Sequence, residues 1–131
     1  MRIGEVADAV GLPTRTVRYY ERRGLLPEPE RAANGYRVYD DQALSRLRFI
    51  RTAQAAGLTL AEIRSIIALR DDGSVPCEHV GALLKAKLAE VGDRMGQLQR
   101  LEADLARLIQ RSRRLDPADC PDGAVCHILQ Q

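Results

Sequence analysis

Apolar residues near the start of the chain fall at helical spacing in two consecutive segments. Ile3, Val6, Ala7 and Val10 share one face of a first predicted helix, which the sequence GLP interrupts at residues 11–13. A second predicted helix, TRTVRYYERRG, has a proline at its start and a glycine at its end. Two short helices joined by a glycine-containing turn are typical of a helix-turn-helix, but an ordinary helical hairpin with a solvated basic face shows the same pattern.

The pattern then changes to that of a β-hairpin. Asn34-Gly35 is a strong turn sequence, and the residues after it, YRVY, alternate as a strand does. A hairpin directly after a helix-turn-helix is a wing. It would place Tyr36, Arg37 and Tyr39 where they could press against a phosphate backbone.

Two further amphipathic segments, DDQALSRLRFIRTAQAAG and LTLAEIRSIIALRDDG, predict helices. Asp40 or Asp41 would cap the first and Thr59 the second. Their large apolar residues are interpreted as core and not as a site: Leu44, Leu47, Phe49, Ile50, Leu60, Ile63, Ile66 and Ile67.

The longest pattern predicts one uninterrupted helix over residues 80–113. Its apolar residues follow a heptad-like seam with one skipped position: Leu84, Leu88, Val91, Met95, Leu98, Leu101, Leu105 and Leu108. Such a helix is about 50 Å long at the usual rise per residue. Nothing else in the chain is large enough to cover that stripe, so the sequence predicts a homodimer formed through this helix.

Composition narrows the class of protein. The 131 residues suit one domain with an extension, and the absence of a long apolar run or signal core favours a cytoplasmic protein with no membrane contact. Residues 1–70 contain 12 arginines, no lysine and eight acidic residues, whereas the remainder is slightly acidic. Arginine matches phosphate oxygens and guanine edges, which is compatible with nucleic acid. An odd number of cysteines argues for reduced thiols.

These segments together resemble the MerR family of bacterial transcription regulators. The resemblance is carried by IGEVADAVGLPTRTVRYYERRGLLPEPER, by NGYRVYD and by LRFIRTAQAAGLTLAEI ahead of the long helix, and it extends to about residue 113. It implies a mostly α fold: a winged helix-turn-helix that reads a palindromic operator, a long antiparallel coiled-coil dimerisation helix and a short metal-binding loop. The implied divisions are a DNA-binding domain over 1–70, a connector carrying Cys77 over 71–79, the dimerisation helix over 80–113 and an effector loop over 114–131.

The resemblance also implies the partners: promoter DNA, RNA polymerase at that promoter and a second copy of the chain. Metal binding in this family activates transcription by distorting a promoter whose elements are too far apart. The second predicted helix turns Val17 inward, and Arg15 and Arg18 are expected to contact bases or position the DNA. The complete set of expected DNA-binding residues is Thr14, Arg15, Thr16, Arg18, Tyr19, Tyr20, Arg31, Tyr36, Arg37 and Tyr39.

Three cysteines are the candidate effector ligands. Cys77 precedes the long helix, and Cys120 and Cys126 follow it in the polar segment DCPDGAVCHI. Antiparallel pairing, as the family's heavy-metal sensors imply, would bring Cys77 of one subunit beside the two loop cysteines of the other. Thiolates are soft ligands and favour Hg(II), Cd(II), Pb(II), Zn(II) or Cu(I) over Mg(II) or Ca(II).

The number of thiolates favours a divalent ion. The family's copper-selective members resemble this chain but have serine at the position of Cys77, so its presence favours a soft divalent effector (Hg, Cd, Pb or Zn) bound by three thiolates. Zn(II) usually takes four ligands, and His127, His79, Asp119 or Asp122 could supply the fourth. Of these, His127 is a candidate, whereas His79 is interpreted as a surface residue at the helix start. The chain departs from the family's mercury, cadmium and lead sensors, whose first loop cysteine usually lies near the position of Ser112.

Two alternatives use the same scaffold. One is a thiol redox sensor with a Cys120–Cys126 disulfide, which would leave Cys77 unexplained, and the other is a Cu(I)-responsive regulator. An enzyme such as a thiol oxidoreductase has little support, because the sequence lacks a C-x-x-C motif and a βαβ pattern.

Overall fold

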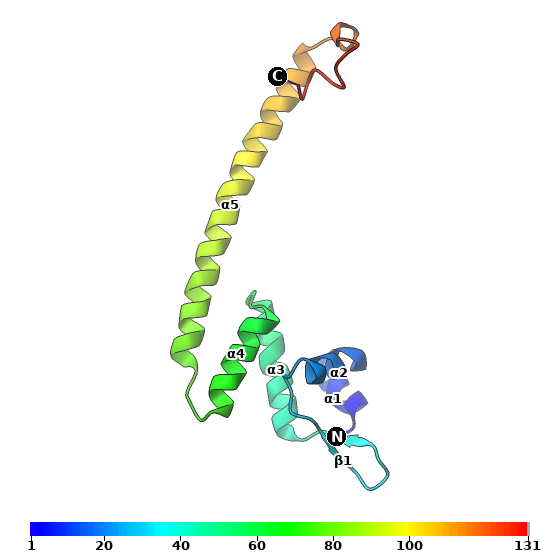
Figure 1. The fold of residues 1–131 in the computed structure, drawn as a ribbon, viewed down its shortest axis with the longest axis vertical. Coiled ribbons are helices and arrows are strands. Elements are labelled where there is room, and N and C mark those ends of the chain that lie inside the picture. The colour runs from blue at the N-terminus through cyan, green and yellow to red at the C-terminus, as the bar shows by residue number, and fades with distance from the viewer. Residues whose placement is uncertain (131) are drawn as a thin grey trace. The chain divides into compact units, whose positions relative to one another are not determined.

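The computed structural model describes residues 1–130, which divide into two compact units, residues 1–87 and 88–130. The first unit begins with α1 (Ile3–Val10) and α2 (Thr14–Arg22), which form the predicted helix-turn-helix. Gly11 ends α1 because it adopts a φ of 69°, which favours glycine, and Pro13 precedes α2 in an extended conformation. Figure 1 shows α1 and α2 close together at the start of the chain.

The predicted wing is a two-stranded antiparallel hairpin of β1 (Glu30–Arg31) and β2 (Arg37–Val38), shorter than the alternating residues suggested. Its turn depends on Asn34-Gly35: the Asn34 side chain accepts a hydrogen bond from the Tyr36 amide at 3.2 Å, and Gly35 has a φ of 82°. In Figure 1 the hairpin extends away from the helices of this unit. The winged helix-turn-helix is therefore confirmed.

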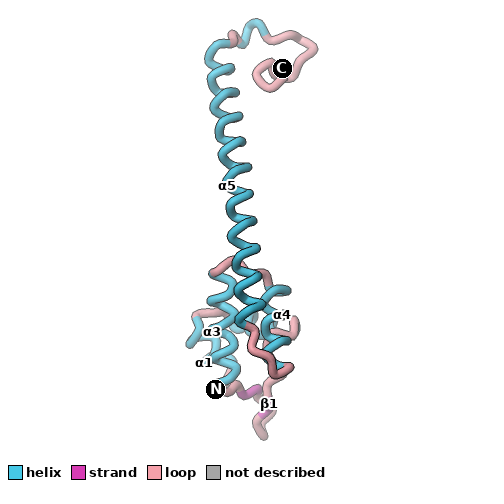
Figure 2. The backbone as a smooth tube through the Cα atoms, turned by 90° about the vertical axis from the view of Figure 1, so that its left-hand side faces the viewer, coloured by secondary structure: helices cyan, strands magenta, loops and turns pink. Residues whose placement is uncertain are grey.

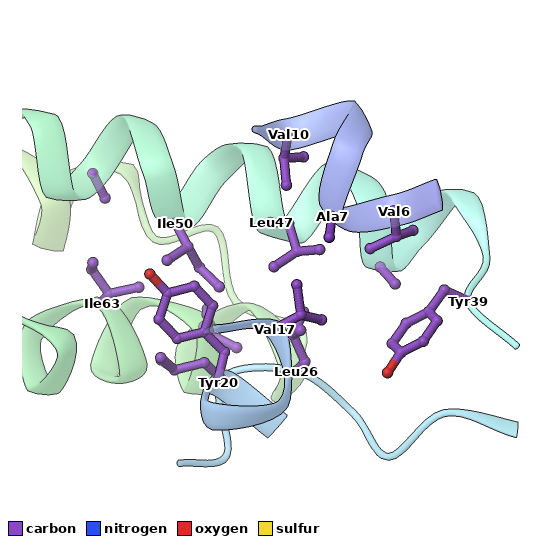
Figure 3. Close-up of a cluster of buried hydrophobic side chains, with 14 of the residues drawn as sticks. Val6, Ala7, Val10, Val17, Tyr20, Leu26, Tyr39, Leu47, Ile50 and Ile63 are labelled. Carbon is purple, nitrogen blue, oxygen red and sulfur yellow. The ribbon is translucent and has the colours of Figure 1, made fainter. Parts of the chain in front are cut away.

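Helices α3 (Asp41–Ala55) and α4 (Leu60–Asp71) complete the core of the first unit. Asp40 caps α3 by accepting the Ala43 amide at 2.9 Å, and Thr59 caps α4 in a capping box with Glu62. Figure 3 shows side chains from α1, α2, α3 and α4 meeting in one cluster. Of the predicted core residues of α3 and α4, five are buried and three half-buried; the buried ones are Leu47, Ile50, Ile63, Ile66 and Ile67.

Helix α5 (Cys77–Arg114) has 38 residues and begins three residues before the predicted start, so Cys77 belongs to its first turn. Two polar contacts join this first part of α5 to α4. His79 Nε2 lies 2.9 Å from Ser65 Oγ, and Lys87 Nζ lies 3.1 Å from the Glu62 carboxylate. His79 lies at the start of α5, as the sequence indicated, but it is half-buried and its ring is hydrogen-bonded to Ser65.

The second unit contains the rest of α5, which includes no buried residue, and the segment that follows it. That segment contains one 3-10 turn, η1 (Pro117–Asp119), and in Figure 2 it curls back beside the last turns of α5. Within the described residues, no helix is long and apolar enough to cross a membrane.

Candidate DNA-binding surface and thiol groups

One face of α2 is free for a partner. Arg15, Arg18 and Tyr19 are exposed, Thr14 and Thr16 are half-buried, and Val17 is fully buried beneath them. This alternation arises because α2 packs through Val17 and Tyr20, which are three residues apart and so share one side of the helix. The exposed face carries the arginines that the sequence assigned to DNA.

Two of the expected DNA-binding residues, Tyr20 and Tyr39, are buried. Tyr20 is 4% exposed and donates a hydrogen bond to Gln54 Oε1 at 2.9 Å, and Tyr39 is 3% exposed and donates one to the Glu21 carboxylate. Burial, followed by the hydrogen bond to Glu21, raises the pKa of Tyr39 to about 12. Both rings lie in the core, and both hydroxyl groups are hydrogen-bonded to protein side chains.

A surface depression lies where α1, α2 and the wing meet. Arg2, Arg18, Arg31 and Arg37 line it together with Tyr36 and with the acidic residues Glu5 and Asp8. The Arg2 guanidinium lies over the Tyr36 ring at 4.4 Å, and Arg31 donates to the Gly35 carbonyl at 2.9 Å. Four guanidinium groups around one depression suit the oxygens of a phosphate backbone.

Arg2 is the residue of this surface that the sequence analysis missed. It reaches the wing because the Met1 backbone pairs with that of Tyr39, with the Tyr39 amide donating to the Met1 carbonyl at 2.6 Å. A pairing of residues so far apart in sequence leaves no local pattern. The basic residue beside the first helix was the available signal, and it is a weak one.

All three cysteines are free thiols. Cys77 is exposed in the first turn of α5, whereas Cys120 and Cys126 are half-buried in the segment after α5. Across residues 1–130 of a single chain, no three His, Cys, Asp or Glu side chains gather as a metal site. His127 was suggested as a fourth ligand. Its main-chain carbonyl accepts a hydrogen bond from Arg111 at 2.9 Å.

Comparison with known proteins identifies the family to which this fold belongs. Residues 1–73 match the MerR HTH family regulatory proteins, and residues 44–108 match the family described as MerR, DNA binding. The chain is 39% identical to the mercuric resistance operon regulatory protein of Bacillus cereus over 92% of both chains.

Two solved structures are also similar. One is the transcription regulator PbrR691 of Ralstonia metallidurans CH34 in complex with lead(II), with 41% identity and a TM-score of 0.80 over 92% of this chain and 94% of that one. The other is the dual-function regulator MerR of Bacillus megaterium MB1 in complex with mercury(II), with 31% identity and a TM-score of 0.66 over 97% and 92% of the two chains. By the matched length, the identity and the winged helix-turn-helix, this chain belongs to the MerR family of DNA-binding transcriptional regulators and is not an enzyme.

Proposed function

We propose that this protein is a metal-responsive transcriptional activator that binds promoter DNA as a homodimer and responds to a soft divalent ion held by Cys77, Cys120 and Cys126. The observation that carries the proposal is the arrangement of three free thiols around α5. One lies in its first turn and two lie in the segment that follows its last residue. The relatives named for mercuric resistance, and those solved with lead(II) and mercury(II), support this class of effector.

The dimer is supported by the apolar side chains of α5. Eight large ones are between 43% and 74% exposed and recur every three or four residues: Leu84, Leu88, Val91, Met95, Leu98, Leu101, Leu105 and Ile109. Ile109 takes the last place, where the sequence pattern suggested Leu108, which is half-buried. An apolar stripe this long calls for a partner surface, and a second copy of the helix has the matching length and spacing.

An antiparallel pair would bring Cys77 of one subunit to the loop cysteines of the other. Three thiolates suit Hg(II), Cd(II) or Pb(II), and a Zn(II) ion could add the His127 imidazole as a fourth ligand. The bound ion would supply strong bonds between one subunit's loop and the other subunit's α5. Those bonds would stabilise one of two dimer conformations, which is the requirement for a ligand to act as a switch.

The proposed DNA contacts are the surface residues that remain after Tyr20 and Tyr39 are removed. Arg15 and Arg18 on α2 are suited to base edges, and the wing and Arg2 to phosphates. The proposed set is Thr14, Arg15, Thr16, Arg18, Tyr19, Arg31, Tyr36 and Arg37, with Arg2 added. Rotation of the two wings in the metal-bound dimer would change the twist of the promoter, and RNA polymerase would read that distortion.

The test is a titration of the reduced dimer with Hg(II), Cd(II), Pb(II), Zn(II) and Cu(I), with alkylation of each cysteine read by mass spectrometry. We expect one divalent ion to protect Cys77, Cys120 and Cys126 together, and the same ion to raise transcription from the operator in vitro. Protection of Cys120 and Cys126 alone by Cu(I) would indicate a copper regulator. A Cys120–Cys126 disulfide that changes transcription without metal would indicate a redox sensor. Either result would replace the proposal.

A further inference from the structure

The segment after α5 has little regular structure to hold its two cysteines in place. Its own hydrogen bonds are local: Asp116 accepts the Ala118 amide at 2.9 Å, and the Cys126 amide donates to the Gln130 side chain at 2.8 Å. The Gln130 amide in turn donates to the Cys126 carbonyl at 3.2 Å. Residues 126–130 therefore form a closed turn, but these bonds do not attach that turn to α5.

Arg111, in the last turn of α5, makes the attachment. Its Nε donates to the carbonyls of His127 at 3.2 Å and Ile128 at 3.1 Å, and its Nη2 donates to the His127 carbonyl at 2.9 Å. Three bonds from one rigid guanidinium to two adjacent carbonyls fix both the position and the direction of the turn. We call these three hydrogen bonds the Arg111 clasp. Because their acceptors are main-chain atoms, the clasp does not depend on which side chains stand at residues 127 and 128.

The clasp lies next to a proposed metal ligand. Cys126 directly precedes His127, so a bond that immobilises the His127 carbonyl also restricts where the Cys126 sulfur can lie. An ordered ligand loses less conformational freedom when it binds than a mobile one does. In addition, three thiolates around a divalent ion carry one excess negative charge, which a nearby guanidinium favours.

We propose that Arg111 is a positioning residue of the effector site, holding Cys126 in a conformation ready for metal before any metal binds. The inference rests on the proposed function, because it concerns the same thiolates. It adds to the site a residue outside the ligand set. Outer partners of metal ligands commonly change metal affinity by about 10–100-fold when they are replaced.

The experiment compares Arg111→Ala and Arg111→Lys with the matched control Arg113→Ala, which removes an exposed arginine two residues away on the same helix. Two quantities are measured in the full-length reduced dimer. The first is hydrogen exchange of a peptide covering residues 120–130 in metal-free protein. The second is affinity for Pb(II) and for Hg(II), each in competition with a small dithiol and read from thiolate-to-metal absorbance. Circular dichroism and dimer mass show whether each variant retains its fold.

We expect Arg111→Ala to exchange faster over residues 120–130 and to bind metal about 10–100-fold more weakly, with all three thiols still engaged at saturation. Arg111→Lys should fall between it and the wild type, because an ammonium keeps the charge but not the fork. Unchanged exchange in Arg111→Ala would overturn the inference whatever the metal result, as would equal losses in Arg111→Ala and Arg113→Ala. If exchange rises but metal affinity does not change, the clasp is structural only and the positioning role is wrong. A wild-type protein that binds no metal at its thiols would reject the proposed function, and the role of Arg111 toward metal with it.

Discussion

The hydroxyl group of Tyr39, at the base of the wing, donates a hydrogen bond to the carboxylate of Glu21, near the end of α2. The other carboxylate oxygen of Glu21 lies 3.4 Å from Arg37 Nη1 on the wing. One carboxylate therefore joins α2 to the wing, the two elements that are proposed to contact DNA. The hairpin has only two residues in each strand, so contacts with the rest of the unit, this connection among them, contribute to the orientation of the wing.

The first prediction concerns the titration of Tyr39. Its pKa is raised from 10.0 to about 12, so the folded protein holds the phenolic proton more tightly than the unfolded chain does. The resulting stabilisation is complete below about pH 10 and is lost as the pH rises through about 12. Relative to Tyr39→Phe, the free energy of unfolding of the wild type should fall by up to about 1.4 kcal/mol per pH unit across that window. Urea unfolding of both proteins from pH 8 to 12 measures the difference, and parallel curves would show that Tyr39 does not titrate as described.

The second prediction concerns operator recognition by α2. Replacing Arg18 by alanine should weaken operator binding by about 1–3 kcal/mol, as expected for the loss of one bidentate base contact. Arg37→Ala should instead weaken binding to all sequences similarly, as expected of a phosphate contact. Binding is measured with operator and scrambled duplexes at the same salt concentration. Arg64→Ala, on an exposed position of α4, is the control, and an Arg18→Ala protein that matches it would remove Arg18 from the recognition surface.

The third prediction concerns the proposed dimer. Leu98, which is 63% exposed within one chain, lies in the apolar stripe of α5, so Leu98→Glu would place a charge without a partner in the interface of both subunits. We expect the variant dimer to dissociate at a higher protein concentration than the wild-type dimer does. Operator binding should be lost with the dimer. Ala89→Glu adds the same charge on the opposite side of the helix and should leave both properties intact. Sedimentation of the two variants decides the matter, and a Leu98→Glu protein that remains dimeric would exclude this stripe as the interface.

The fourth prediction tests whether one metal site is built from two chains. Cys77→Ser and the double variant Cys120→Ser, Cys126→Ser should each bind metal poorly. A heterodimer of the two contains one end where an intact Cys77 faces an intact loop, so one tight site should return, whereas a site built within one chain would stay defective in both subunits. Co-expression with two affinity tags yields the heterodimer, and thiolate-to-metal absorbance counts its sites. Purified heterodimer without a tight site would reject the intersubunit arrangement and Cys77 as a ligand.

Much of the fold follows from local patterns in the sequence. The apolar spacing of residues 3–10, the caps Asp40 and Thr59, and the turn at Asn34-Gly35 each express a preference of a few neighbouring residues, and each occurs in the structure as expected. The stripe along α5 is also a local periodicity. For the same reason, the sequence identified the outward arginines of α2 by the position of Val17 between them.

The tertiary structure decided which polar groups meet over long stretches of chain. Tyr20 and Tyr39 lie in a basic segment and resemble surface residues, yet their rings are buried, and their hydroxyl groups donate hydrogen bonds to the Gln54 and Glu21 side chains. Arg2 joins the arginine-lined depression only because the backbones of Met1 and Tyr39 pair. Arg111 donates hydrogen bonds to the main-chain carbonyls of His127 and Ile128. Every residue type has such a carbonyl, so the sequence does not indicate which ones Arg111 contacts. Periodicity reports which face of an element is apolar, whereas these contacts depend on how separate elements pack, and that packing is encoded across the whole chain.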